Sequence, residues 1–145
     1  MVGAIITGHA QFASGMVNAA VMLLGDDIKI IGIDYDGGDT KELTERIINA
    51  VNAFEKSVSV FILCDIMGGT PYRTAATATR ECENVLLLYG ANLDMVMDLC
   101  MRNYDNEIPE SKELAAEIMQ IGKDRIGVFS PPSAEEDNSC ENEGL

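Results

Sequence analysis

Four short apolar segments alternate with segments of helical periodicity, and this alternation limits the possible folds more than any other feature of the sequence. The apolar segments cover residues 2–7, 28–33, 58–64 and 85–89. Each contains few polar side chains, as expected for a strand that helices cover on both faces. Strands that are joined through helices form parallel sheets. We therefore predict an α/β fold, with an open, mostly parallel four-stranded sheet and helices on both faces.

Helix-start signals mark the segments between these strands. Asp39 followed by Glu42 resembles a capping box before the second helix. Thr70 followed by Pro71 predicts a third helix, in which Thr70 is the N-cap and Pro71 the first helical residue. Near the C-terminus we predict a further helix over about residues 111–122 and a last short strand over residues 126–129.

The chain is strongly acidic. Its 145 residues include 24 acidic and 10 basic ones, and the net charge is −14. Nucleic acids and anionic membrane surfaces would repel such a chain, so we expect neither as a partner and favour basic proteins. Part of the excess lies in residues 131–145, which begin with two prolines and contain no lysine or arginine. We predict one domain over residues 1–130 and an acidic, disordered tail over residues 131–145.

Cysteine and histidine usage does not indicate a metal or a cofactor. The four cysteines, Cys64, Cys82, Cys100 and Cys140, form no C-x-x-C pair, and the chain has one histidine. No zinc pattern results, and the Walker and G-x-G-x-x-G nucleotide-binding motifs are absent. The N-terminus lacks a signal-peptide pattern, and no apolar run approaches the roughly 18 residues of a membrane span. We predict a cytoplasmic protein without metal or cofactor.

Polar and glycine-rich segments follow the predicted strands at residues 8–9, 34–39, 65–70 and 90–92. In open parallel sheets, ligands and chemistry lie at the carboxyl ends of the strands. The loops after the first and third strands of such sheets are commonly neighbours. We therefore expect His9 and Asp65 to lie close together.

An Asp–His pair at this edge predicts nucleophilic or general-base chemistry. A carboxylate on one ring nitrogen fixes the tautomer and leaves the other nitrogen as a nucleophile. Gly68 and Gly69 allow close backbone approach, and a helix start at Thr70 directs unpaired N–H groups and the positive helix end at the site. The segment after His9 also starts a helix. Two helix N-termini beside an Asp-oriented imidazole suit a phosphoryl group on His9, because phosphoryl transfer needs positioning and charge stabilisation above all.

Further candidates for lining this site are Asp34, Met67, Asn92 and Phe12. Several features also have plainer interpretations. A lone histidine is commonly a surface residue, Gly-Gly-Thr-Pro is a common strand-to-helix turn, and Phe12 at helical spacing is typical of helix packing. A response-regulator receiver would also use acidic residues, but its acidic pair follows the first strand, where this chain has Gly8 and His9.

Residues 9–16 after the first strand and residues 65–71 after the third strand resemble the IIA component of the mannose family of the bacterial sugar phosphotransferase system. Ile33-Asp34 before a glycine-containing turn and residues 90–93 extend the resemblance, which covers roughly residues 1–130. Either motif alone is weak, but both in order at matching elements are specific. The family often has serine where Thr70 stands and an aromatic residue where Met67 stands.

The resemblance implies that His9 takes a phosphoryl group from the phosphocarrier HPr and passes it to a histidine of the IIB component. IIB then phosphorylates sugar during uptake through the membrane subunits IIC and IID. The resemblance also implies that Asp65 orients the His9 ring and that the Thr70 hydroxyl contacts the phosphoryl group. The family is typically a homodimer whose subunits exchange the last strand, here residues 126–129. One alternative is a related module outside sugar transport, either a regulatory IIA-like domain or the phosphotransfer subunit of dihydroxyacetone kinase. Another is a binding module without catalytic activity. The sugar is not indicated, because a IIA domain never contacts it.

Overall fold

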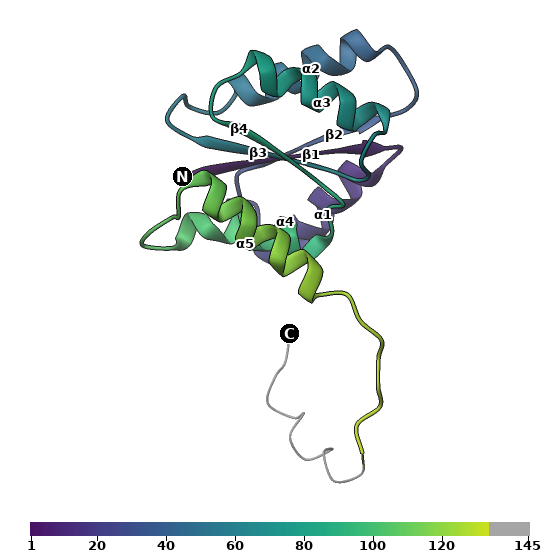
Figure 1. The fold of residues 1–145 in the computed structure, drawn as a ribbon, viewed down its shortest axis with the longest axis vertical. Coiled ribbons are helices and arrows are strands. Elements are labelled where there is room, and N and C mark those ends of the chain that lie inside the picture. Colours follow the sequence, from purple (N-terminus) through teal and green to yellow (C-terminus); the bar gives the residue numbers. More distant parts are fainter. Residues whose placement is uncertain (134–145) are drawn as a thin grey trace.

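A computed structural model describes residues 1–133 and shows a four-stranded sheet between two helical layers (Figure 1). All strand pairs are parallel, and the strand order is β2-β1-β3-β4. The strands are β1 (Val2–His9), β2 (Ile30–Tyr35), β3 (Ser59–Cys64) and β4 (Val85–Tyr89). The predicted α/β class and the four-stranded sheet are confirmed, and within the described residues the sheet is entirely parallel.

Helices cover both faces of the sheet. Two helices lie on one face and three on the other, and a short 3₁₀ helix follows the fourth (Figure 1). The first layer consists of α2 (Thr40–Asn52) and α3 (Thr70–Glu81). The second layer consists of α1 (Phe12–Leu24), α4 (Leu93–Met101), the 3₁₀ helix η1 (Arg102–Tyr104) and α5 (Ser111–Asp124). Neighbouring helices within each layer are in contact.

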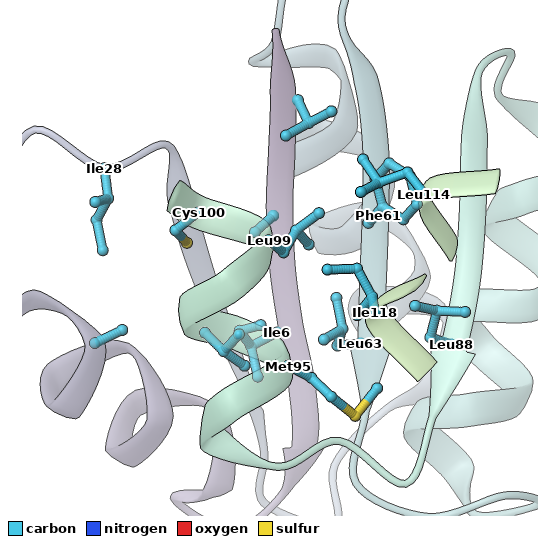
Figure 2. Packing of buried hydrophobic residues seen from close by; sticks show 14 of the residues in the cluster. Ile6, Ile28, Phe61, Leu63, Leu88, Met95, Leu99, Cys100, Leu114 and Ile118 are labelled. Carbon is cyan, nitrogen blue, oxygen red and sulfur yellow. The ribbon is translucent and has the colours of Figure 1, made fainter. Parts of the chain in front are cut away.

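The strands are apolar throughout because each sheet face has its own core. Side chains alternate between the two faces along a strand, so Ile5 packs toward α2 and α3 while Ile6 packs toward the other layer. Figure 2 shows the core between the sheet and the layer that contains α1, α4 and α5. Buried residues of α4 and α5 pack there against buried residues of the strands: Met95, Leu99, Leu114 and Ile118 against Ile6, Phe61, Leu63 and Leu88.

β1 is a central strand, so its carboxyl end lies between the carboxyl ends of β2 and β3. His9 is the last residue of β1 and pairs with Tyr35 at the end of β2. On the other side Thr7 pairs with Cys64, the last residue of β3, so Asp65 follows directly at the same edge. The predicted adjacency of the first and third strands is confirmed.

The start of α3 differs from the prediction by one residue. Gly69 is the N-cap and Thr70 the first helical residue, followed by Pro71. The reason is the first intrahelical bond, in which the Arg73 N–H donates to the Gly69 carbonyl at 3.0 Å. Thr70 therefore does not cap the helix with its side chain.

The predicted C-terminal strand is absent from the part of the chain that the structure describes. Residues 126–133 contain neither helix nor strand and extend away from α5 (Figure 1). Ile126, Val128 and Phe129 are 79%, 94% and 83% exposed, because no strand among residues 1–133 pairs with this segment. Of the predicted acidic tail, residues 134–145 lie outside the described residues. Among the described helices, none combines the length and apolar character needed to cross a membrane.

Candidate functional site

His9 and Asp65 are in direct contact at the carboxyl edge of the sheet. His9 Nδ1 lies 2.6 Å from Asp65 Oδ2, and the backbone N–H of His9 donates to the same oxygen at 2.8 Å. The other carboxylate oxygen accepts from the Ile66 N–H at 2.8 Å. Burial raises the pKa of Asp65, but these hydrogen bonds from His9 and Ile66 outweigh burial and hold the pKa below its ordinary value.

The contact determines which ring nitrogen is free. An ionised carboxylate only accepts hydrogen bonds, so Nδ1 carries the proton and Nε2 keeps its lone pair. No residue in the range 1–133 forms a hydrogen bond with Nε2. The His9 side chain is 45% exposed, whereas that of Asp65 is 12% exposed. The pair therefore presents an accessible nucleophile backed by a shielded carboxylate.

Gly69 lies directly against the His9 ring. A Cβ atom at this position would lie 2.7 Å from His9 Cε1, closer than real Cβ contacts allow, and 3.3 Å from Nε2. The preceding Gly68 has a φ of +81°, a conformation that glycine adopts without strain. These two glycines let the start of α3 approach the imidazole.

The N-terminus of α3 is available to an anion. No side chain caps it, and Pro71 in the first turn has no N–H. The first intrahelical N–H donor is Arg73, so the N–H groups of Thr70 and Tyr72 precede the hydrogen-bonded ladder. The Thr70 hydroxyl forms no hydrogen bond with any residue that the structure describes. The N-terminus of α3 thus offers free N–H groups, a free hydroxyl and the positive helix end, and its N-cap residue Gly69 lies against the His9 ring.

The N-terminus of α1 is occupied. The Ser14 N–H in its first turn donates to Asp34 Oδ1 at 2.9 Å. Asp34 is held in turn by Arg46, whose Nη1 donates to the Asp34 carbonyl at 3.1 Å. The expectation treated both helix N-termini as open to a phosphoryl group, but the N-terminus of α1 already holds the Asp34 carboxylate.

The other candidate residues lie at different places. Met67 is 64% exposed on the turn between β3 and α3, two residues after Asp65 in the sequence. Phe12 is partly buried and packs against the core and against Gly8. Asn92 caps α4 by accepting from the Met95 N–H at 3.1 Å and donates to the Gly122 carbonyl of α5 at 3.0 Å. Its side chain therefore links two helices and does not contact His9.

Sequence analysis did not single out Tyr35, which contacts His9. The two rings are edge-to-face, with centroids 6.1 Å apart and an interplanar angle of 74°. The Tyr35 carbonyl also accepts from the Ala10 N–H at 2.7 Å. Ala10 has a φ of +50°, which alanine rarely adopts. The available signal was positional, because Tyr35 ends the strand that neighbours β1.

Within residues 1–133, no group of three or more histidine, cysteine, aspartate or glutamate side chains is arranged to hold a metal ion. Burial, with a smaller contribution from the Asp65 charge, raises the pKa of Cys64 to about 12. Burial also raises the pKa of Cys100 to about 11. Both thiols therefore stay protonated at neutral pH and behave as small core side chains.

Comparison with known proteins finds components of the phosphotransferase system among the relatives. The family profile described as PTS system fructose IIA component matches residues 3–117. The PTS system fructose-specific EIIA component of Bacillus subtilis (strain 168) is 28% identical over 100 residues, which are 68% of each chain. The PTS system mannose-specific EIIAB component of Escherichia coli (strain K12) is 27% identical over 85% of this chain, but this chain spans only 38% of that longer protein.

A solved structure agrees with the fold. The crystal structure of the phosphotransferase system component EIIA from Streptococcus agalactiae superimposes with a TM-score of 0.78 at 21% sequence identity. The match covers 89% of this chain and 98% of that chain. At this identity the likeness establishes the fold alone.

Proposed function

The chain belongs to the mannose-type family of IIA components of the phosphotransferase system, and from this premise we propose that it carries a phosphoryl group on Nε2 of His9. The group comes from HPr and goes to a histidine of the IIB component, which phosphorylates the sugar during uptake. The observation that carries the proposal is the 2.6 Å contact between His9 Nδ1 and Asp65, which leaves Nε2 free beside the N-terminus of α3.

Each transfer exchanges one bond to phosphorus for another. The Nε2 lone pair attacks the phosphorus atom, the bond between phosphorus and the donor breaks, and the donor keeps that electron pair. The ring becomes positively charged, and its Nδ1 proton stays hydrogen-bonded to Asp65. The carboxylate stabilises this charge without accepting the proton. The second transfer reverses the sequence toward IIB.

The start of α3 holds the oxygens of the phosphoryl group. The N–H groups of Thr70 and Tyr72 and the Thr70 hydroxyl are the donors, and Gly68 and Gly69 allow the backbone to approach. Charge spreads over the phosphoryl oxygens in the transition state, so donors that are already oriented lower the barrier. Met67 offers an apolar contact for HPr and for IIB, both of which must reach the same face.

A homodimer completes the proposed assembly. The edge strand β4 has no partner on its outer side among the described residues. A cavity of about 320 Å³ lies beside it, lined by residues that include Leu88, Met119 and Ile126. Residues 126–129 of a partner subunit would pair with such an edge and bury their exposed apolar side chains. Ending the chain after Arg125 should therefore convert a dimer into a monomer in sedimentation-velocity experiments.

The location follows from the partners. We infer that the protein works in the cytoplasm and meets the membrane subunits IIC and IID through IIB. Its acidic surface favours basic faces on HPr and IIB.

Phosphorylation by purified components tests the function. With phosphoenolpyruvate, enzyme I and HPr, the protein should gain one acid-labile phosphoryl group, and ¹H–¹⁵N correlation spectra of labelled histidine should place it on Nε2. His9→Ala should gain none while keeping the wild-type circular dichroism spectrum. Labelling that persists in His9→Ala, or a wild type that no such donor phosphorylates, would overturn the proposal. Transfer to a IIB component distinguishes sugar transport from the regulatory and dihydroxyacetone-kinase alternatives.

A further inference from the structure

We propose that Tyr35 is a positioning residue, which holds the His9 ring in the orientation that directs Nε2 toward the N-terminus of α3. The inference rests on the proposed function of His9 as the phosphoryl carrier. It concerns a residue of β2, outside both turns that carry the His9, Asp65 and Thr70 side chains.

One hydrogen bond does not fix the ring. The bond between Nδ1 and Asp65 leaves the imidazole free to tilt about that bond, and a tilt displaces Nε2. Gly69 limits the tilt on one side, because its backbone lies against Cε1 and Nε2. Gly69 follows β3, and Tyr35 ends β2, which lies on the opposite side of β1. The edge-to-face contact at 6.1 Å therefore limits the tilt from the other side.

Tyr35 is itself held at both ends. Its hydroxyl donates to the Gly38 carbonyl at 3.2 Å, and its ring packs on the core beneath α2 and α3. Its carbonyl accepts from the Ala10 N–H at 2.7 Å, one residue after His9. This hydrogen bond supports Ala10 in its left-handed conformation, with a φ of +50°. The same residue thus holds the turn after His9 and the ring of His9.

Orientation matters for this chemistry in particular. Phosphoryl transfer requires the attacking and leaving atoms to lie roughly in line through phosphorus. A displacement of about 1 Å at a reacting atom lowers rates by about 100-fold. Loss of one of three contacts around a ring that keeps its hydrogen bond to Asp65 should displace Nε2 by less, so we expect a loss of about tenfold.

Two substitutions of Tyr35 and one control separate positioning from general packing. Tyr35→Leu removes the aromatic ring, and Tyr35→Phe keeps it while removing the hydrogen bond to Gly38. Phe54→Leu is the matched control, because the Phe54 ring packs on Gly3 at the opposite end of the same strand, β1. The rate of phosphoryl transfer from HPr is measured by rapid quench. The His9 ring is followed in the unphosphorylated protein by ¹H–¹⁵N correlation spectra.

Tyr35→Leu should slow transfer about tenfold and broaden the His9 ring signals as the ring samples several orientations, while the hydrogen bond to Asp65 keeps the ring in the same tautomer. Tyr35→Phe should stay within about twofold of the wild type, and Phe54→Leu should leave the rate and the ring signals unchanged. Wild-type rates and ring signals in Tyr35→Leu, or an equal loss in Phe54→Leu, would overturn the inference. A wild type that HPr cannot phosphorylate overturns the proposed function instead, and the ring spectra still decide whether Tyr35 orients His9.

Discussion

Two strand-to-helix turns meet at His9, and they use their helix N-termini in opposite ways. The turn from β1 to α1 begins directly after His9, the last residue of β1, yet the Ser14 N–H of α1 is bound by the Asp34 carboxylate. The turn from β3 to α3 contains Asp65, and α3 has no side-chain cap and a free Thr70 hydroxyl among the described residues. One turn follows the nucleophile, and the other supplies the carboxylate and the donors for an anion.

The difference shows that a helix N-terminus is an anion site only where no side chain has already occupied it. Asp34 stabilises α1 because a carboxylate at an N-terminus interacts favourably with the helix dipole. The same carboxylate repels a phosphoryl group. At α3, an N-cap glycine leaves the N–H groups unpaired, which costs some stability and leaves donors for a ligand. Substitutions at the start of α3 should therefore change mainly the transfer rate, and loss of the Asp34 carboxylate from the start of α1 should change mainly the free energy of unfolding.

The largest effect should come from the charge of the β3–α3 turn. Asp65→Asn keeps the shape of the side chain but removes the charge that stabilises the phosphorylated ring, and it permits the wrong ring tautomer. We expect phosphoryl transfer to slow by at least about 100-fold, in line with tautomer loss in other Asp–His pairs. Asp36→Asn removes a charge from the same edge without contacting His9 and should leave the rate near that of the wild type. Equal rates in the two variants would contradict the role of Asp65.

Lowering the pH should show how much the Asp65 carboxylate contributes to the stability of the folded protein. The pKa of Asp65 is lowered in the folded protein, so the unfolded chain binds its proton at a higher pH than the folded chain does. The carboxylate therefore contributes stability above about pH 4, the ordinary range of aspartate, and loses that contribution as the pH falls through the lowered pKa. In urea unfolding between pH 7 and pH 2, the wild type should lose more stability than Asp65→Asn. Parallel curves would contradict this assignment.

Filling the space between Gly69 and the His9 ring should lower the transfer rate nearly as much as Asp65→Asn does. Gly69→Ala places a Cβ atom 2.7 Å from His9 Cε1, and the ring must move away from α3. A ring displacement of about 1 Å predicts a transfer rate about 100-fold lower. Gly15→Ala is the control, since no atom lies within 4 Å of a Cβ there. It should keep the rate and stabilise α1 by up to about 1 kcal/mol. A normal rate in Gly69→Ala would show that the close contact is unimportant.

Removing one donor from α3 should have a moderate effect. Thr70→Val keeps the size of the side chain and loses the hydroxyl, so one hydrogen bond to the phosphoryl group disappears. We expect a loss of about tenfold, corresponding to about 1.4 kcal/mol of transition-state stabilisation. Thr70→Ser should restore the rate, because serine keeps the hydroxyl. If valine and serine behaved alike, the hydroxyl would have no part in transfer.

The smallest effect on transfer should come from the occupied helix. Asp34→Ala removes the acceptor of the Ser14 N–H and should lower the free energy of unfolding by about 1 kcal/mol, as other lost caps do. The transfer rate should change less than about threefold, because the donors that hold the phosphoryl group lie on α3. Chemical denaturation measures the first effect and rapid quench the second. If Asp34→Ala changed the transfer rate tenfold and left the stability unchanged, Asp34 would act in phosphoryl transfer and would not stabilise α1.

Much of this arrangement was predictable. Apolar strands alternating with helices required a parallel sheet, and polar residues after the first and third strands indicated His9 and Asp65 at one edge. The predicted N-cap at Thr70 was one residue too late, because Thr-Pro marks a helix start without specifying which carbonyl accepts the first bond. Asp34, predicted to line the site, also accepts a hydrogen bond from the first turn of α1, which the sequence did not indicate. Its partner, Ser14, lies 20 residues away in sequence, and no local pattern links the two.

The sequence by itself determined the fold class, the identity of the paired side chains and the strand ends on which they lie. These properties follow from periodicity, since alternation in strands and helices dictates which residues are buried and where chains turn. Only the tertiary structure decided that Nδ1 faces Asp65, that α1 is occupied and α3 open, and that Tyr35 contacts the ring. Those properties depend on side-chain rotamers and on the register between strands, which bring together residues that no local pattern connects.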